Sequence, residues 1–243
     1  MTGWPAGYRR KDYAELDSTN EEVRRLAEAG EKGPLWISAT RQSAGRGRRG
    51  RAWNTGEGNL AATLLLRPEA SQAITGQLSF AAALAAAEMV QHFAPDAAVT
   101  VKWPNDVLAE GRKIAGILLE GALDAQGGWL AIGIGVNLAH HPEGLAFPAS
   151  SLPQLGIAPP SCDAALTVLA VRFAHWYDAW MRYGFETLRK AWLGRASGLG
   201  APITARLPNG TRQGVFEGVD ASGALLLNEQ GHVRAIAAGE VFF

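Results

Sequence analysis

The sequence predicts an α+β protein with a mixed, largely antiparallel central sheet, helices packed on that sheet, and a small C-terminal β-barrel. Three observations lead to this prediction. Strand-like segments between residues 99 and 137 are joined by short Gly-containing turns, which require antiparallel pairing of neighbours. Two longer segments, 72–93 and 163–192, have the apolar spacing of helices. Beyond residue 196, short strands alternate with turns.

The N-terminal part contains signals for a short helix that ends at Gly30, two apolar strands, and a long Ala-rich helix. A Gly- and Arg-rich loop separates the two strands. In chain order, we expect the helix over 21–29, a strand over 35–39, the loop over 43–59, a strand over 60–66 and the long helix over about 72–93.

Three further strands are expected over 99–108, 113–120 and 129–137, and Pro104 breaks the first of them. The segment 113–120 is the most apolar, which places it centrally in the sheet. After a Pro-rich loop, the aromatic residues of 163–192 fall at helical spacing, which is typical of core packing rather than of a ligand site.

The C-terminal strands are expected over 203–207, 211–218, 224–228 and 232–237. The dipeptide Asn209-Gly210 between the first two is a strong hairpin signal. A barrel of about 45 residues needs to dock on a larger domain to be stable. We therefore expect two domains, 1–196 and 197–243.

The composition excludes several classes of protein. Among 243 residues, 23 basic and 23 acidic side chains give no net charge, so no global field attracts nucleic acid or membrane lipid. Cys162 is the single cysteine, which excludes an intrachain disulfide and a thiolate metal cluster. The N-terminus has no signal-peptide core, and the apolar stretch 78–90 is shorter than the roughly 20 residues of a membrane span. We expect a soluble, cytoplasmic protein.

The most informative segment is the loop Gly45-Arg46-Gly47-Arg48-Arg49-Gly50-Arg51. It matches the dinucleotide pattern G-x-G-x-x-G, but no apolar helix follows it. Four arginines in six residues would also fit a nucleic-acid patch. Alternating glycines let the backbone approach a ligand, and guanidinium groups suit carboxylate and phosphate oxygens. We therefore predict a mobile loop that covers an anionic nucleotide.

The segment Lys102-Trp103-Pro104-Asn105-Asp106 places an amide and a carboxylate at a strand end, which a simple turn would also explain. Lys113 follows Asp106 by seven residues and enters an apolar strand. A lysine in that position is costly unless its ammonium reaches solvent or a partner, such as an anionic substrate. Glycines in 133–137 indicate close approach of a ligand or backbone to the third strand.

The segment Asp17-Ser18-Thr19-Asn20 has a structural explanation. Thr19 with Glu22, and Ser18 with Glu21, have the spacing of a capping box. Taken alone, the segment favours a helix cap over a binding site, although a helix N-terminus can do both.

Taken together, four motifs of this sequence resemble the catalytic core of biotin–protein ligases. They are Ser-Thr-Asn, Gly-Arg-Gly-Arg-Arg-Gly-Arg, Lys-Trp-Pro-Asn-Asp and Lys-Ile-Ala-Gly-Ile-Leu. The resemblance covers residues 17–137 in motif order and extends more loosely to the C-terminal barrel. It implies a class II synthetase-like core, an SH3-like C-terminal barrel, and ATP-dependent formation of biotinyl-5′-adenylate. It also implies transfer of biotin to a lysine of a biotin carboxyl carrier domain.

The resemblance implies that one set of residues binds biotin and its carboxylate, and that Lys113, Arg46 and Arg48 act in catalysis. The biotin set is Ser18, Thr19, Asn20, Gln42, Gly45, Arg46, Gly47, Arg48 and Lys113. A second set would bind ATP, and Asp106 in it would bind Mg²⁺. The ATP set is Arg48, Arg51, Trp53, Asn105, Asp106 and Asn137.

Regulatory members of that family carry an N-terminal DNA-binding domain, whereas only 17 residues precede Ser18 here, so we expect a ligase without repressor function. A lipoate–protein ligase and a non-catalytic biotin sensor are the alternatives. The arginine loop and Lys-Trp-Pro-Asn-Asp point away from the first. A nucleic-acid binder that uses the arginine loop is disfavoured, because the sequence has no net charge and no second basic stripe. Monomer and homodimer both remain open.

Overall fold

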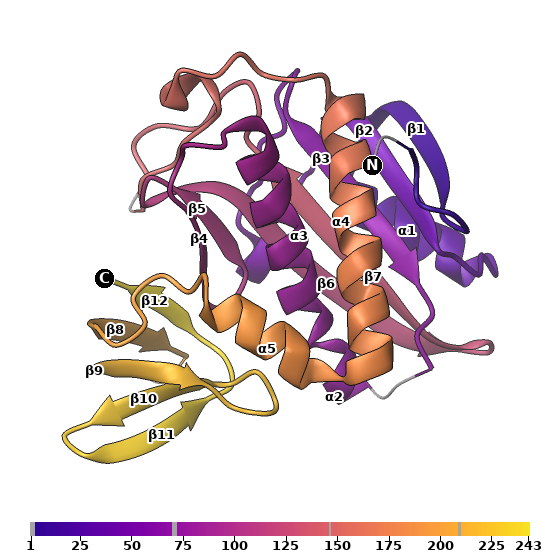
Figure 1. Cartoon of the computed structure of the whole chain (residues 1–243). Helices are drawn as coiled ribbons and strands as arrows, with labels where there is room; N and C mark the ends of the chain where they lie inside the picture. Colours follow the sequence, from indigo (N-terminus) through magenta and orange to yellow (C-terminus); the bar gives the residue numbers. More distant parts are fainter. Residues whose placement is uncertain (1–2, 70–71, 146, 209) are drawn as a thin grey trace.

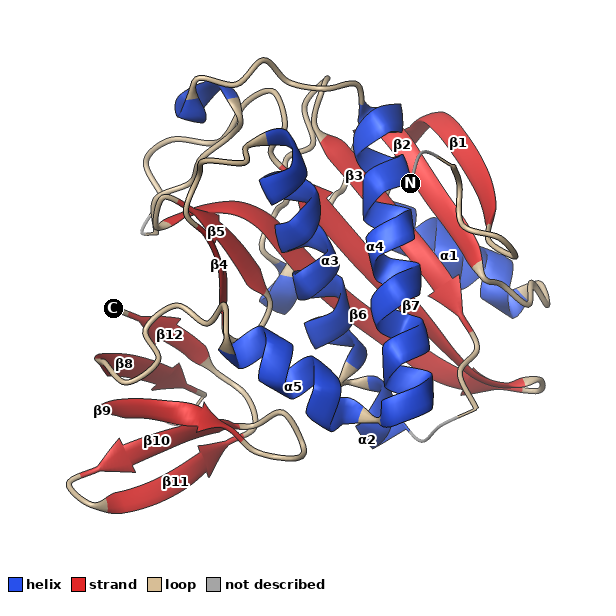
Figure 2. Ribbon diagram, in the orientation of Figure 1, coloured by secondary structure: helices blue, strands red, loops and turns tan. Residues whose placement is uncertain are grey.

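The computed structural model describes residues 3–69, 72–145, 147–208 and 210–243, which form a seven-stranded sheet and a five-stranded sheet (Figures 1 and 2). The larger sheet has the order β1-β2-β3-β7-β6-β5-β4. β1 pairs with β2 in parallel and the other neighbours pair antiparallel, which confirms the predicted mixed sheet. Its strands are β1 (Arg9–Leu16), β2 (Leu35–Gln42), β3 (Leu60–Leu66), β4 (Val99–Lys102), β5 (Asp106–Ala109), β6 (Arg112–Asp124) and β7 (Gly127–Val136).

The two faces of this sheet carry different helices. α3 (Leu78–Phe93) and α4 (Cys162–Tyr183) cover one face, and α1 (Thr19–Glu28) packs on the other (Figure 2). Strand alternation separates the two cores: Trp36 packs toward α3 and α4, whereas its neighbours Leu35 and Ile37 pack with α1.

The structure corrects three expected boundaries. The helix expected over 72–93 is two helices, α2 (Gln72–Thr75) and α3, because residues 76–77 form a turn that includes a poor helix former, glycine. Gly184 at φ 73° separates α4 from α5 (Phe185–Leu193) within the predicted block 163–192. The strand expected over 99–108 is the hairpin β4–β5, so the interruption at Pro104 reverses the chain.

Two strands were not predicted. β1 lies at the sheet edge with mostly exposed, polar side chains, so it has no apolar alternation. β12 (Glu240–Phe242) is three residues long and pairs with β8. The strand expected to be central, β6, is interior, but β7 occupies the middle position.

The C-terminal strands form an antiparallel five-stranded sheet that contacts the larger unit. Trp103 Nε1 donates to Gly223 O at 3.1 Å, and Arg189 donates to Val219 O at 3.0 Å. Asn209 of the expected hairpin turn lies outside the described residues. The strands are β8 (Pro202–Leu207), β9 (Gly210–Val219), β10 (Leu225–Glu229), β11 (His232–Ile236) and β12, in the order β11-β10-β9-β8-β12.

The domain division at 196/197 stays a prediction. Val101 of β4 exchanges backbone hydrogen bonds with Arg195 and Ser197, at 2.9 and 2.8 Å, so the main sheet holds the chain on both sides of this point. Within the described ranges, no helix has the length and apolar character needed to cross a membrane.

Candidate active site

The predicted site residues gather on the α1 face of the sheet, over three glycines of β6 and β7. A Cβ atom at Gly133 would overlap the Asn20 side chain, and one at Gly135 would overlap the Trp53 indole. A Cβ at Gly116 would stand 3.2 Å from both Trp53 and Lys113. The glycines of 133–137 were predicted to mark close approach of a ligand or of backbone, whereas the groups that approach Gly133 and Gly135 are the side chains of Asn20 and Trp53.

The N-terminus of α1 does not form the predicted capping box. Ser18 is the N-cap residue, yet its side chain makes no capping hydrogen bond. Gln42 Oε1 instead accepts from the Thr19 amide at 2.8 Å and lies 3.1 Å from Thr19 Oγ1. Glu21 and Glu22 form ion pairs with arginines. Because a side chain of β2 satisfies the helix amide, the polar side chains at this terminus are not used for capping.

These buried polar groups form one hydrogen-bonded network. Thr63 Oγ1 lies 2.7 Å from both Thr19 Oγ1 and Asn20 Oδ1, and Asn20 Nδ2 donates to Glu120 Oε2 at 2.7 Å. Gln42 Nε2 donates to Thr55 Oγ1 at 2.9 Å. Sequence reasoning missed Thr63, Glu120 and Thr55, because each lies far along the chain from its partner and has no local motif.

Arg46 is held by the protein itself. Its guanidinium lies 2.5 Å from Glu21 and 3.1 Å from Glu120. The loop closes on itself behind it, since the Gly47 amide donates to Arg51 O at 2.7 Å. Gly45 has no room for a side chain, because a Cβ there would stand 2.8 Å from Gln42 Nε2. The N-terminal part of the loop is therefore anchored to α1 and β6.

Lys113 supplies positive charge beside the Trp53 ring, and Arg48 supplies it at the turn between β4 and β5. Lys113 Nζ lies 2.6 Å from Asp106 Oδ1 and 5.5 Å from the Trp53 ring centroid. The predicted need of Lys113 for a partner is confirmed, and in the described structure that partner is Asp106. Arg48 Nη1 lies 3.3 Å from Asn105 Oδ1 and 3.4 Å from the Gly239 carbonyl.

The remaining predicted residues lie at the edges of this cluster. Asn137 is 4% exposed, and its Nδ2 donates to Ser150 O at 3.0 Å. Ser150 in turn exchanges a backbone hydrogen bond with Lys113, so Asn137 braces the loop beside that lysine. Arg51 pairs with Glu240 of β12. Both side chains are thus occupied by protein partners.

A magnesium ion has one suitable carboxylate here. Asp106 Oδ1 is buried and accepts no hydrogen bond of good geometry, and the Asn105 amide is adjacent in sequence. Across the described residues, no three His, Cys, Asp or Glu side chains converge on a metal position. Mg²⁺ commonly uses one or two carboxylates together with substrate phosphates, and a single aspartate fits that pattern.

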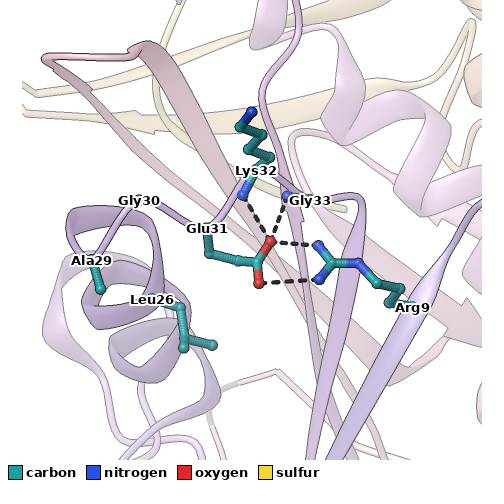
Figure 3. Close-up of a pocket in the computed structure, with 7 residues that line it drawn as sticks. All are labelled: Arg9, Leu26, Ala29, Gly30, Glu31, Lys32 and Gly33. Carbon is teal, nitrogen blue, oxygen red and sulfur yellow. Dashed lines mark hydrogen bonds and ion pairs between the residues drawn. The ribbon is translucent and has the colours of Figure 1, made fainter.

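A separate surface depression lies at the other end of α1 (Figure 3). Of its three charged lining residues, Arg9 and Glu31 are paired with each other. None of the predicted site residues lines it. Its lining residues are Arg9, Leu26, Ala29, Gly30, Glu31, Lys32 and Gly33.

Residues 14–137 match the Biotin/lipoate A/B protein ligase family, and residues 198–243 match the Biotin protein ligase C terminal domain. A biotin--[acetyl-CoA-carboxylase] ligase of Paracoccus denitrificans is 44% identical over 95% of this chain and 98% of its own. The bifunctional ligase/repressor BirA of Bacillus subtilis is 32% identical over 93% of this chain and 71% of its own. The Aquifex aeolicus biotin protein ligase solved with biotin and ATP is 26% identical, with a TM-score of 0.83 over 96% of this chain and 97% of that one.

The chain therefore belongs to the biotin/lipoate A/B protein ligase family. Within that family it is a biotin protein ligase, because it also carries the C-terminal domain of that group.

Proposed function

We propose that this ligase activates biotin with ATP and transfers it to a lysine of a biotin carboxyl carrier domain, in two steps at one site. The observation that carries the proposal is that neighbouring glycines of β7 lie against both groups: Gly133 meets Asn20 of the polar network, and Gly135 meets the Trp53 ring, which lies 5.5 Å from Lys113 Nζ. A cation that can hold a carboxylate and a phosphate thus lies next to neutral donors and acceptors that can hold a urea.

Biotin would lie with its ureido group at the N-terminus of α1. Ser18, Thr19 and Asn20 are each at most 5% exposed, and a urea offers two N–H donors and one carbonyl acceptor to such groups. The biotin carboxylate would reach Lys113 and the backbone of Gly45 and Gly47. Trp53 now covers Gly135 and Gly116, so biotin and ATP would displace or restack this ring.

The nucleotide would bind between the loop and the β4–β5 hairpin. Arg48 would contact the phosphates, Trp53 the adenylate, and Asn105 and Asp106 the nucleotide. Arg51 and Asn137 would contribute at the edges of the site, Arg51 after it leaves Glu240. Asp106 would hold a Mg²⁺ ion, which neutralises phosphate charge when bound.

The first step forms a bond between a biotin carboxylate oxygen and the α-phosphorus of ATP, and pyrophosphate leaves with the electron pair of the broken P–O bond. In the second step, the amine of the acceptor lysine attacks the biotinyl carbonyl, loses a proton and expels AMP. Neither step needs a covalent protein nucleophile. Lys113 and Arg48 would stabilise the negative charge that builds up in the first, and Arg46 would hold the loop in register.

The C-terminal domain match supports biotin over lipoate, because the family match to residues 14–137 covers ligases of both cofactors. The same domain docks beside the loop through Glu240 and Gly239.

The function is tested by exchange of labelled pyrophosphate into ATP in the presence of Mg²⁺. Biotin should support exchange, and lipoate at equal concentration should not. Addition of a biotin carboxyl carrier domain should then give one biotinylated lysine, and its Lys→Arg variant should give none. Exchange driven by lipoate alone would contradict the proposal, as would exchange without transfer.

A further inference from the structure

His140 follows β7 and lies against the loop stem, residues 53–59, which joins the arginine loop to β3. The proposed reaction does not use this histidine. Gly56 of the stem has no room for a side chain, because a Cβ atom there would overlap the His140 imidazole. On the same ring, Nε2 lies 3.2 Å from the carbonyl oxygen of Glu57. The imidazole is therefore seated directly on the main chain of the loop stem.

Asn59 makes a second contact between the loop stem and the same segment. Its Oδ1 accepts from the amide of Ala139 at 2.8 Å and from the amide of His140 at 3.2 Å. Its Nδ2 donates to the His140 carbonyl at 2.8 Å and lies 3.2 Å from His140 Nδ1. Asn59 is 2% exposed, so these partners replace the water that its amide would otherwise bind. One buried amide thus fixes the end of the stem.

The network also decides which nitrogen of the His140 ring carries the proton. Because Asn59 Oδ1 accepts from two backbone amides, the group that faces His140 Nδ1 is the NH₂ of Asn59, a donor. His140 Nδ1 is therefore the acceptor, and the ring proton lies on Nε2, which donates to the Glu57 carbonyl. In this form the ring bonds to two positions of the loop stem at once.

The segment that follows β7 also contacts Lys113. The Lys113 main chain exchanges hydrogen bonds with the main chain of residues 148–150, at 2.9 and 2.8 Å. The next residue, Ser151, is tied back to the start of the segment, because its Oγ lies 2.9 Å from His141 Nδ1. Two adjacent histidines therefore reach in two directions: His140 holds the loop stem, and His141 holds the part of the segment beside Lys113.

These contacts bear on one distance in the active site. Trp53 begins the loop stem, and its ring centroid lies 5.5 Å from Lys113 Nζ. Thr55 is 4% exposed and accepts from Gln42, so the stem is held on that side as well. A shift of the stem at Gly56 would move the Trp53 ring relative to Lys113. A misplacement of about 1 Å in an active site can lower a rate by roughly 100-fold.

We propose that His140 is a positioning residue for adenylation. Its contacts with Gly56 and Asn59 hold the loop stem in place, and they set the distance between the Trp53 ring and the Lys113 ammonium. The inference rests on the proposed function and gives a role in it to a residue outside the biotin and ATP sets. His140 is exposed, so its removal leaves no cavity in the core and should have little effect on stability.

The test is a double-substitution cycle between His140 and Gly56. His140→Ala removes the ring, and Gly56→Ala displaces the ring without removing it. Gly56 lies outside the left-handed region, so alanine brings no backbone strain there. The double variant has the added methyl group but no ring to displace. His140→Gln keeps a side-chain donor for the Glu57 carbonyl, and His175→Ala, at an exposed position on α4, is the control.

The mobility of the loop stem is measured in the free chain by hydrogen–deuterium exchange of residues 53–59, read by mass spectrometry. The constants kcat and KM come from biotin-dependent pyrophosphate exchange. His140→Ala and Gly56→Ala should each increase deuterium uptake of the stem and lower kcat by about tenfold, because Trp53 is displaced. KM for biotin should stay within about twofold, since the polar network at α1 is untouched.

In the chain that already lacks the ring, Gly56→Ala should have no further effect, because the two residues act through one contact. His140→Gln should recover most of kcat, and His175→Ala should match the unmodified chain. The melting temperature should be the same in all of these variants.

A normal kcat in His140→Ala would overturn the inference. Losses that add in the double variant would do the same, since additivity marks independent sites. A lower melting temperature with a normal kcat of the folded fraction would identify the contact as purely structural and also overturn it. If the unmodified chain shows no pyrophosphate exchange with biotin, the proposed function fails, whereas the deuterium-uptake cycle still decides whether His140 holds the loop stem.

Discussion

The indole of Trp53 lies directly against Gly135 of β7, where no side chain fits between the ring and the strand. The same ring is 3.2 Å from the position that a Cβ of Gly116 would take on the neighbouring strand β6. Two paired glycines thus form the flat surface on which an aromatic side chain of the arginine loop rests. This contact connects the loop to the centre of the sheet.

Gly135→Ala should displace Trp53 from β7 and reduce biotin-dependent pyrophosphate exchange by about tenfold, because the added methyl group occupies the surface on which the Trp53 ring and the adenylate have to be aligned. Alanine is compatible with the strand backbone, so the free energy of unfolding should change by no more than about 1 kcal/mol. Gly128→Ala is the matched control on β7, since its Cβ would meet only Leu123 at 3.6 Å. Equal exchange rates in the two variants would show that the Trp53 contact has no role.

Lys113→Ala should lower the rate of adenylation by roughly 100-fold or more, because its charge stabilises the transition state. The melting temperature should change little, since Asp106, with its side chain 18% exposed, can then be hydrated. The measurement pairs single-turnover formation of biotinyl-adenylate with thermal melting. A large loss of melting temperature with normal activity of the folded fraction would identify Lys113 as structural.

Trypsin should cut the free loop after Arg48, Arg49 or Arg51 and spare Arg46, whose guanidinium is paired with Glu21 and Glu120. Biotin with ATP should protect these bonds, because ordering of the loop is offset by new charge-assisted hydrogen bonds. Mass spectrometry of the fragments identifies each site. Glu120→Gln should expose the bond after Arg46, and added DNA should protect none of them. Protection by DNA alone would favour a nucleic-acid patch.

Arg48→Gly should release biotinyl-adenylate before transfer. The guanidinium of Arg48 joins the loop to Asn105 and to the C-terminal segment, so its loss weakens the closed state that retains the intermediate. Unrelated proteins in the reaction should then become biotinylated on exposed lysines, as measured by streptavidin blotting. Arg195→Gly, outside the loop, is the control. Labelling confined to the carrier domain in both variants would contradict retention by Arg48.

Asp17 should make stability depend on pH in the acid range. Hydrogen bonds from Arg25 lower the pKa of this carboxyl to about 2, assisted by the Ser18 amide at 2.7 Å. A carboxylate whose pKa is lower in the folded state contributes stability above its unfolded pKa of about 4 and loses it as the pH falls toward 2. Chemical denaturation of the unmodified chain and of Asp17→Asn should differ at pH 6 and converge near pH 2. A difference that is constant with pH would exclude this linkage.

The sequence by itself determined the secondary structure wherever the signal is local. β3 occupies the predicted residues 60–66, because an apolar run broken only by Thr63 is bounded by a Gly/Asn segment and by Arg67-Pro68. The turns between β6 and β7, and between β10 and β11, are likewise set by glycine-containing segments. The resemblance in motif order also predicts that Ser18, Arg48 and Lys113 belong to one site. Edge strand β1 escaped prediction because solvent-facing polar residues carry no periodicity.

Only the tertiary structure decided which charges meet. Glu120 accepts from Asn20 and pairs with Arg46, although 100 residues separate it from one and 74 from the other. The rings around Lys102 come from Phe147 and from the chain end, Phe242 and Phe243. Such contacts arise when the strand order and the docking of the C-terminal domain bring distant segments together. Local sequence preferences do not predict either of these. The motifs specified the chemistry of the site, and the packing of β6, β7 and β12 decided how its charges are shared.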